Sequence, residues 1–410
     1  MGLESKTSAH RRAQASDVLV LLDASGPLTR RDVAEALDLH PASANRVVAS
    51  LIDRGVITRT AQVPSDGPGR PTDRLALAED AGHAVGIEFG RGRLAVTVLD
   101  ATGQVVLARD AEDAPPFRAD LTTTDGIAEA VRNASIAAGL PSERLFAVGV
   151  ALHDVVDADG RWTTQDRPHD PPFDVRNALE DRLGAGVHVD DVSRAFATAE
   201  HRFGAGAGES DTVYVFVGSH GVGGGLFVNG SMLVSSSGHC GEIGHVIIDE
   251  NGARCQCGAR GCLETVASPR AARRRLRELL HEGVASSLGP DAEFDELCRA
   301  SERGDAAAST VLDEIGGAVA HALAPTVNLA GTPVAIVGGG LRNAGPAFLH
   351  RVASTLRTRV VPGLAPRVDV RFAALPPHAG AWGVAATARE RALRDGALLD
   401  LPASVAVPAS

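Results

Sequence analysis

The strongest constraint in the sequence is a group of three cysteines and one histidine within eighteen residues. Cys255, Cys257 and Cys262 form the pattern C-x-C-x4-C, and His245 lies ten residues before the first of them. One imidazole and three thiolates are the complete ligand set of a closed, tetrahedral zinc site. Thiolates favour zinc over magnesium or calcium, and four protein ligands leave no position for a catalytic water. The sequence therefore predicts a structural Zn²⁺ held by these four side chains.

Two other interpretations of the cysteines stay open, namely buried packing and a disulfide. Cys255 and Cys257 are poorly placed to bond to each other, and the chain has five cysteines in 410 residues. The sequence shows no secretory signal that would direct it to an oxidising compartment. The remaining two cysteines, Cys240 and Cys298, are expected to be buried packing residues.

The composition is that of a soluble globular protein with two or three domains. Apolar residues make up 44% of the chain, and the mean hydropathy is +0.02. No apolar run reaches the roughly 18 residues of a membrane-spanning helix, and without targeting signals we expect a cytoplasmic protein. The net charge is −11, but residues 1–75 carry ten Lys and Arg against nine Asp and Glu. The overall acidity therefore does not exclude DNA binding by the N-terminal segment.

The first 75 residues carry the pattern of a winged helix-turn-helix. Thr29 and Asp32 form a capping box at the start of one short helix. A second helix begins at Pro41, has one apolar face and stops at Gly55. Two short helices joined by a tight turn indicate a helix-turn-helix. Two β-rich segments, 56–61 and 74–78, flank a Gly- and Pro-rich hairpin and would form the wing.

Four polar residues are placed to contact DNA. Ser43, Asn45 and Arg46 lie on the polar side of the second helix, near its start, where they can reach base edges and phosphates. Arg70, in the hairpin, is placed to enter the minor groove. The alternative is a small protein-interaction module with solvated polar residues. We predict operator DNA as the partner.

Two acidic residues flank the metal-binding segment, Glu242 before it and Glu264 after it. A rigid loop would present both carboxylates and His245 to the hydroxyls of a polyol. The sequence E-x-G-H followed by C-x-C-G-x-x-G-C-x-E resembles the signature of the ROK family, which comprises repressors, open reading frames and sugar kinases. The resemblance implies that the histidine and the three cysteines bind zinc, and that Glu242, His245 and Glu264 face a sugar.

The resemblance covers residues 15–395 and implies the fold class. It implies an α/β protein in which a winged helix-turn-helix is followed by a two-lobed, actin-like ATPase fold with mixed sheets. The N-terminal segment, with G-R-P in its hairpin, resembles the heads of ROK repressors. We expect a DNA-binding domain at 1–78, an N-terminal lobe at 79–195 completed by the helix 380–396, a C-terminal lobe with the zinc site at 196–379, and a tail at 397–410.

The phosphate loops of ROK kinases are altered in this sequence. The first loop, of the type D-x-G-G-T-K, corresponds to residues 88–93, Glu-Phe-Gly-Arg-Gly-Arg, which lack the double glycine and the lysine. A β-hairpin turn is the alternative interpretation of that segment. In the second loop, residues 219–225, His220 replaces the family's threonine, whereas the glycines remain. These glycines serve either a nucleotide or a tight crossing of strands.

The catalytic aspartate of the family is displaced as well. Aligned on Ala199-Glu200, it falls on Val192, and Asp191 takes the place of the preceding asparagine. The resemblance makes Asp191 a sugar ligand, and a shift of one residue would make it the general base of a kinase. Alternatively, Asp190 and Asp191 cap a helix predicted at 192–203.

These observations predict a sugar-responsive transcriptional regulator of the repressor type, without kinase activity and without catalytic residues. It would act as a homodimer or homotetramer and would not contact a membrane. One alternative is a sugar kinase that kept an N-terminal head, with Asp191 as its base. Another is a regulator with a vestigial sugar pocket, because His153-Asp154 replaces the family's Pro-Gly at a turn that lines the sugar.

Overall fold

The chain crosses twice between two units, after Asp190 and after Gly383. In the computed structural model one unit is Met1–Asp190 with Val384–Ser410, and the other is Asp191–Gly383. The structure describes residues 3–63, 72–90, 93–110, 124–153, 155–157, 159–163, 173–218, 221–235 and 239–402. The expected division placed the end of the first lobe five residues later, at 195, and treated the N-terminal head as a separate domain. In the structure the head belongs to the first unit.

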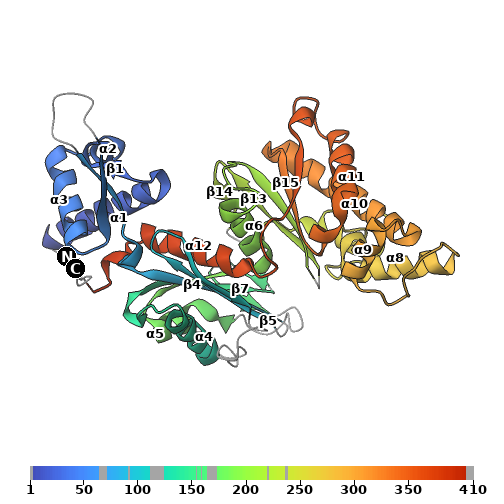
Figure 1. The fold of residues 1–410 in the computed structure, drawn as a ribbon, viewed down its shortest axis with the longest axis horizontal. Coiled ribbons are helices and arrows are strands. Elements are labelled where there is room, and N and C mark those ends of the chain that lie inside the picture. Colours follow the sequence, from blue (N-terminus) through green and yellow to red (C-terminus); the bar gives the residue numbers. More distant parts are fainter. Residues whose placement is uncertain are drawn as a thin grey trace. The chain divides into compact units, whose positions relative to one another are not determined.

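The head is a winged helix-turn-helix (Figure 1). Its elements are α1 (Leu3–Ser25), β1 (Leu28–Thr29), α2 (Arg30–Ala36), α3 (Pro41–Asp53), β2 (Ile57–Val63) and β3 (Thr72–Leu77). The three strands form one antiparallel sheet in the order β1-β3-β2. The wing tip with Arg70 lies outside the described residues.

Local sequence signals account for the ends of these helices. The predicted capping box is present, because Thr29 Oγ1 accepts a hydrogen bond from the Asp32 amide and the Asp32 carboxylate accepts one from the Thr29 amide. Gly55, two residues past α3, has a φ of +69°, which favours glycine at a helix stop. α1 starts at Leu3, so its polar N-terminal half is helical as well as the apolar half that contains Val18, Leu19 and Leu22.

The first lobe is built on a five-stranded mixed sheet. Its strands, in spatial order, are β11 (Gly186–Asp191), β7 (Leu145–Leu152), β4 (His83–Gly90), β5 (Arg93–Asp100) and β6 (Val105–Asp110). A smaller sheet contains β8 (Val155–Val156), β9 (Arg161–Thr163) and β10 (Phe173–Asp174). The helices α4 (Thr124–Ala137) and α5 (Val175–Leu183) cover one face of the main sheet, and α12 (Gly380–Arg394) lies on the other (Figure 1). A Cβ atom at Gly149 of β7 would lie 2.3 Å from the Val384 carbonyl oxygen, so α12 packs directly on the strand backbone.

The second unit is built on another five-stranded mixed sheet. Its strands, in spatial order, are β14 (Ser231–Met232), β13 (Val222–Val228), β12 (Thr212–Val217), β15 (Val334–Gly339) and β16 (Asp369–Phe372). Its helices are α6 (Val192–Phe203), α7 (Glu264–Ala267), α8 (Pro269–His281), α9 (Phe294–Glu302), α10 (Ala306–Ala330) and α11 (Gly345–Arg357). Apolar side chains of β12 face the α8–α11 core on one side, and Tyr214 packs with α6 on the other. The two mixed sheets and the head confirm the predicted fold class.

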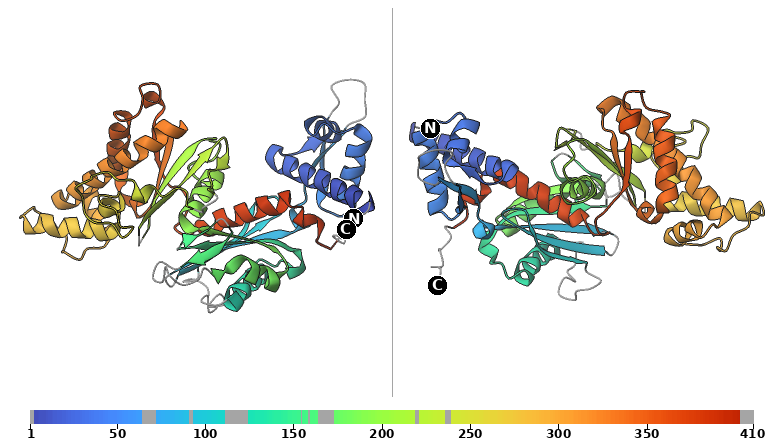
Figure 2. Two further views of the ribbon diagram at one scale, coloured as in Figure 1. Left: turned by 180° about the vertical axis from the view of Figure 1, so that it is seen from behind. Right: turned by 45° about the horizontal axis from the view of Figure 1, so that its top comes forward.

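The head is joined to the first lobe by a continuous hydrophobic core. Val18, Leu19 and Leu22 of α1 are buried in one cluster with Leu393 of α12 and with Phe146 of β7. Figures 1 and 2 show the head against the end of α12. Burial of apolar surface stabilises a contact by about 25 cal/mol per Å². The head is therefore held by packing rather than by a free linker.

A buried ion pair lies within this junction. Both Nη atoms of Arg389 on α12 donate to the carboxylate of Asp23 on α1, and Nε and Nη2 also donate to the Ala101 carbonyl oxygen at 3.0 and 2.6 Å. The Arg389 side chain is 5% exposed. A bidentate pair in such an environment fixes geometry as well as contributing energy. It fixes how α1 meets α12.

The segment after α12 also holds the head, although sequence analysis expected a tail from residue 397. Both Nη atoms of Arg12 donate to the Asp400 carboxylate, each at 2.6 Å. Arg54, the C-cap of α3, donates to the carbonyl oxygens of Leu399 and Leu401. The Leu398 side chain is buried in the same core. Residues 397–402 are thus part of the junction.

No helix in the described ranges is long and apolar enough to cross a membrane.

We expect Arg389→Ala to destabilise the unit that contains the head by about 3 kcal/mol, because it leaves the Asp23 carboxylate and the Ala101 carbonyl without their donor. The measurement is the urea midpoint of the first unfolding transition of the full chain. Arg394→Ala is the matched control, since Arg394 lies on the same helix with its side chain 63% exposed and should change stability by about 0.5 kcal/mol or less. Equal midpoints for the two variants would show that the pair contributes nothing.

Candidate metal centre and ligand-binding site

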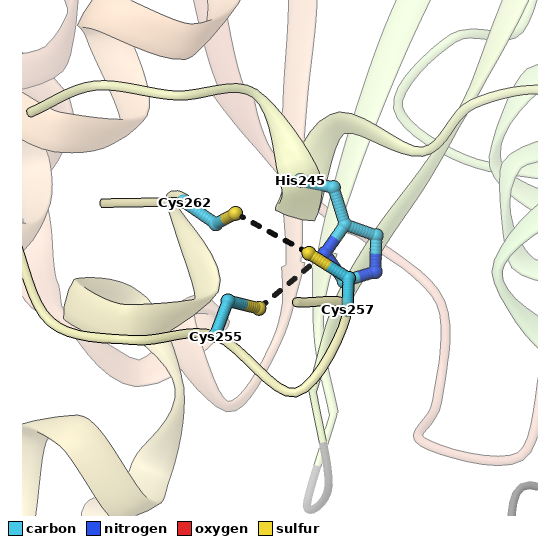
Figure 3. Close-up of side chains that lie close together, drawn as sticks. All are labelled: His245, Cys255, Cys257 and Cys262. Carbon is cyan, nitrogen blue, oxygen red and sulfur yellow. Dashed lines mark hydrogen bonds between the residues drawn. The ribbon is translucent and has the colours of Figure 1, made fainter. Parts of the chain in front are cut away.

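The four predicted metal ligands converge on one point in the loop between β14 and α7 (Figure 3). One nitrogen or sulfur atom of each lies within 4.8 Å of those of the other three. The distance from His245 Nδ1 to Cys255 Sγ is 3.6 Å, and that from Cys257 Sγ to Cys262 Sγ is 3.7 Å. Zn–S bonds of about 2.3 Å and Zn–N bonds of about 2.0 Å place tetrahedral ligands about 3.5–3.8 Å apart. The cluster fits a tetrahedral metal ion.

Two glycines allow the loop to turn tightly enough to bring the ligands together. Gly258 and Gly261 have φ angles of +97° and +67°, which side chains rarely tolerate. A Cβ atom at Gly261 would also lie 1.5 Å from the Asp249 carbonyl oxygen. The Cys255 amide donates to the Ala259 carbonyl oxygen at 2.8 Å, which closes the turn. The metal ligands are thus placed by backbone geometry.

The thiols of the cluster have divergent acidities. Burial raises the pKa of Cys262 to about 12, with further increases from the neighbouring thiols. Burial also raises the pKa of Cys255, whereas the Ala259 backbone amide lowers the pKa of the more exposed Cys257. A metal ion binds thiolates, so binding must release these protons. The affinity for metal should therefore fall as the pH is lowered.

The metal loop positions Glu264 against the glycine-rich strand β13. Glu264 follows Cys262 by two residues and begins α7. Its Oε2 atom accepts a hydrogen bond from the Val222 amide at 3.2 Å. A Cβ atom at Gly221 would lie 2.5 Å from the same oxygen, so a larger residue there would displace the carboxylate. The carboxylate is half-buried beside the loop that resembles the second phosphate loop.

Glu242 is more exposed and also lies next to β13. It precedes the 3₁₀ turn Ile243–His245, and its Oε1 lies 3.5 Å from His239 Nδ1. The preceding Gly241 has a φ of +80°, and a Cβ atom there would lie 2.3 Å from the Gly224 carbonyl oxygen. Backbone-to-backbone packing therefore fixes where the Glu242 side chain begins.

Asp191 caps α6, one of the alternatives that sequence analysis left open. Its Oδ1 accepts from the amides of Ser193 and Arg194 at 2.6 and 3.1 Å. Val192, on which the family's catalytic aspartate falls, is a buried apolar residue. Asp191 is the N-cap residue of α6, whereas Oδ2 of the preceding Asp190 lies 3.3 Å from His188 Nε2 on the same strand. The helix itself has the predicted bounds, Val192–Phe203.

The glycines of β13 are required by close packing. A Cβ atom at Gly223 would lie 2.1 Å from Ser193 Oγ, and one at Gly225 would lie 2.4 Å from Ala197 Cβ, both on α6. The same strand contacts the turn before Glu242 and the carboxylate of Glu264. The segments that carry Asp191, Glu242 and Glu264 therefore all pack on this one strand.

Sequence analysis missed one charged residue of this region, Arg194. It is 6% exposed, and its Nη1 lies 3.7 Å from Asp191 Oδ2. Arg194 follows Asp191 by three residues, and residues at this spacing on a helix face each other. This spacing could have indicated that the two side chains interact. Arg194 therefore belongs to the polar surroundings of the candidate site.

The two strands that flank residues 91–92 of the altered first phosphate loop pair with each other. β4 and β5 pair along their whole length, to Gly90 opposite Arg93. The Glu88 side chain is buried and lies 3.3 Å from His153 Nε2 at the end of β7. The neighbouring Asp154, like His220 of the second loop, lies outside the described residues.

The candidate DNA-contacting residues lie near the start of α3. Asn45 and Arg46 are exposed and Ser43 is half-buried. Arg46 Nη2 lies 3.4 Å from Ser43 Oγ, and Arg30 Nη1 lies 3.4 Å from Asn45 Oδ1. The opposite face of α3 is buried in the head through Ala44, Val47, Val48 and Leu51. The exposed face of α3 is therefore not needed for packing within the head.

Comparison with known proteins finds the same two parts. A family model described as ROK family matches residues 84–391, and one described as MarR family matches residues 12–70. The chain is 30% identical over 392 residues to the DNA-binding transcriptional dual regulator NagC of Escherichia coli K12, covering 95% of each chain. It is 33% identical over 223 residues to a glucokinase of Thermotoga maritima, covering 53% of this chain and 70% of the glucokinase.

A solved structure is similar over the whole length. It is that of a ROK family transcriptional regulator described as a homologue of the Escherichia coli Mlc protein. The TM-score is 0.80 at 26% sequence identity, and the match covers 96% of this chain and 99% of that one.

We expect Cys257→Ser to abolish stoichiometric zinc binding, because serine removes one of four ligands and a soft thiolate. The measurement is the zinc content of the purified full chain by mass spectrometry of the element. Cys240→Ser is the matched control, since Cys240 lies outside the cluster and should leave the content at one ion per chain. Unchanged zinc in Cys257→Ser would contradict the ligand assignment.

Proposed function

The chain belongs to the ROK family, and from this we propose that it is a sugar-responsive, DNA-binding transcriptional repressor. The observation that carries the proposal is the extent of the similarity. The match to the regulator NagC covers 95% of this chain, head and body together, whereas the match to a glucokinase covers 53%. A winged helix-turn-helix fused to a ROK body is therefore the organisation of a regulator.

In this proposal α3 reads the operator in the major groove. Asn45 and Arg46 are exposed near the helix start, the position from which recognition helices contact base edges. Ser43 supports Arg46 by their contact at 3.4 Å, and Arg70 of the wing contacts the minor groove. Two heads are needed to read a symmetric operator, so the protein acts as a homodimer or homotetramer.

We assign zinc to the cluster of His245 and the three cysteines. Soft thiolates and a closed ligand set support this metal over magnesium or calcium. The ion would be structural, and its four bonds would fix the start of α7. Because Glu264 lies two residues beyond Cys262, the metal would set the position of that carboxylate.

We assign the sugar to the carboxylates gathered around β13. Glu242, Glu264 and Asp191 would accept hydrogen bonds from sugar hydroxyls, and His245 would contribute the ring nitrogen that does not bind the metal. A ligand that prefers one conformation of the body shifts the population toward it, by as much as its affinities for the two conformations differ. The head, packed on α12, would follow that change and alter the affinity for DNA.

Kinase activity is the alternative from another class. It is disfavoured because phosphoryl transfer needs a nucleotide cradle and a positioned base. Here Val192 replaces the aspartate, and Asp191 Oδ1 is engaged by two backbone amides of α6. The strands on either side of the first phosphate loop pair as far as Gly90 and Arg93, and the loop has no lysine. ATP turnover with any sugar of a panel, lost in Asp191→Ala, would establish the kinase instead.

We expect one sugar of a panel to raise the thermal stability of the zinc-loaded full chain. A hundredfold excess over Kd stabilises the native state by about 2.7 kcal/mol. The shift should vanish in Glu242→Ala and persist in Glu250→Ala, an exposed glutamate nearby in sequence. An equal shift in both variants would refute the assignment of Glu242. No shift with any sugar would favour the regulator with a vestigial pocket.

We expect Arg46→Ala to weaken specific DNA binding about tenfold and to lower the salt slope by about one if Arg46 meets a phosphate. The probe is a duplex selected from random sequences by the wild-type protein. Arg303→Ala, an exposed arginine of the other unit, is the control and should bind like wild type. Equal affinities of the two variants over a salt titration would show that α3 does not read the DNA through Arg46.

A further inference from the structure

A cavity between α10 and α11 that is open to solvent, with exposed His321, Arg351 and Arg359 side chains, has no role in the function proposed above. Its volume is about 550 Å³, and it lies within the unit Asp191–Gly383. None of its lining residues is a proposed metal, sugar or DNA ligand. Pockets of about 300–1,000 Å³ hold small organic ligands. The cavity is large enough for one.

Its lining is cationic and hydroxyl-rich. His321 comes from α10, Arg351 and Thr355 come from α11, and Arg359 follows α11. Among the residues that the structure describes, no carboxylate lines the cavity. Such a lining selects for a negatively charged ligand with several acceptor oxygens.

Three of these side chains have unused donors. Among the described residues, His321, Thr355 and Arg359 make no side-chain hydrogen bond or ion pair. Arg351 forms an ion pair with Asp313, which is not a lining residue, and its Nε lies 3.2 Å from Asp313 Oδ1. A ligand therefore meets donors that need not first give up a protein partner.

The backbone around Arg359 is held in place. Asn328 of α10 donates through Nδ2 to the Arg359 carbonyl oxygen at 3.2 Å and accepts from the Val361 amide at 2.9 Å. On the other side, Gly316 and Gly317 leave room for Arg351, since a Cβ at Gly316 would lie 3.1 Å from its Cγ. Binding at the cavity would therefore require little rearrangement of the backbone.

We propose that this cavity binds a small phosphorylated metabolite, whose phosphate is held by Arg359, Arg351, His321 and Thr355. The planar guanidinium of Arg359 matches the oxygens of a phosphate bidentately. Ala318 and Ile248 line the cavity with apolar surface, against which an attached ring packs. The proposal stands independently of sugar sensing, since it uses no residue of the sugar site.

The cavity also adjoins the metal loop. Ile248, three residues after His245, lines the cavity, and its amide donates to the Gly261 carbonyl oxygen at 2.8 Å. Gly261 precedes the metal ligand Cys262. A ligand in the cavity thus contacts the segment that positions Glu264, which gives the site a route to influence sugar binding.

The test is calorimetric titration of the zinc-loaded full chain with inorganic phosphate and with pyrophosphate, at ionic strength held constant with sodium chloride. We expect saturable binding to wild type and a Kd at least tenfold higher in Arg359→Gln. Arg303→Gln, which removes an exposed arginine away from the cavity, should bind like wild type. Thr355→Val removes one hydroxyl donor but keeps the positive charge of the cavity, and we expect a smaller increase in the Kd for phosphate than in Arg359→Gln.

Two results would overturn the proposal. One is the absence of saturable binding to wild type beyond the sodium chloride control. The other is an equal Kd in wild type and Arg359→Gln, which would place any phosphate elsewhere, such as at the glycine-rich loop before β13. Glu242→Ala should retain phosphate binding, so a failure of the sugar assignment is distinguishable from a failure of this one.

Discussion

The close packing of backbone on β13 is the constraint on which the candidate ligand site depends. Side chains at Gly223, Gly224 or Gly225 would collide with α6 or with the segment around Gly241. These glycines are therefore explained without a nucleotide. The glycines that resemble a kinase's phosphate loop let this chain pack the three segments with the candidate sugar ligands onto one strand. A regulator can thus keep the kinase's glycine pattern for reasons of packing alone.

A metal ion in the cluster of His245 and the three cysteines would add a second constraint to that of packing. The loop from His245 to Cys262 contains one 3₁₀ turn and two isolated β-bridges, and so little regular structure orders it. Four metal bonds would order it, and the free energy of binding would become folding free energy for this loop. The carboxylate of Glu264 would then be oriented by an ion as well as by the hydrophobic core that buries the neighbouring Leu263.

The features that sequence could predict are those fixed by neighbours along the chain. Three such features depend on residues close together in the sequence. They are the spacing of the cysteines, the capping box of Thr29 and Asp32, and the bounds of α6. The packing of Val18, Leu19 and Leu22 with Leu393 could not be predicted, because Leu393 lies about 370 residues further along the chain. The α10–α11 cavity was equally hidden, since its arginines and hydroxyls look like an ordinary solvated helix face until the two helices meet.

The shared core of head and first lobe limits how such a protein can diversify. Val18, Leu19 and Leu22 of α1 lie in one hydrophobic cluster with Leu393 of α12, and Asp23 pairs with Arg389. A head taken from another regulator would lack this complementary face, so exchange of heads as whole modules requires matching changes on α12 and in residues 397–402. The exposed face of α3 does not have to match any surface of the first lobe. If α3 reads the operator as proposed, new operator sequences would be reached most readily by substitutions on α3, while the interface behind it stays constant.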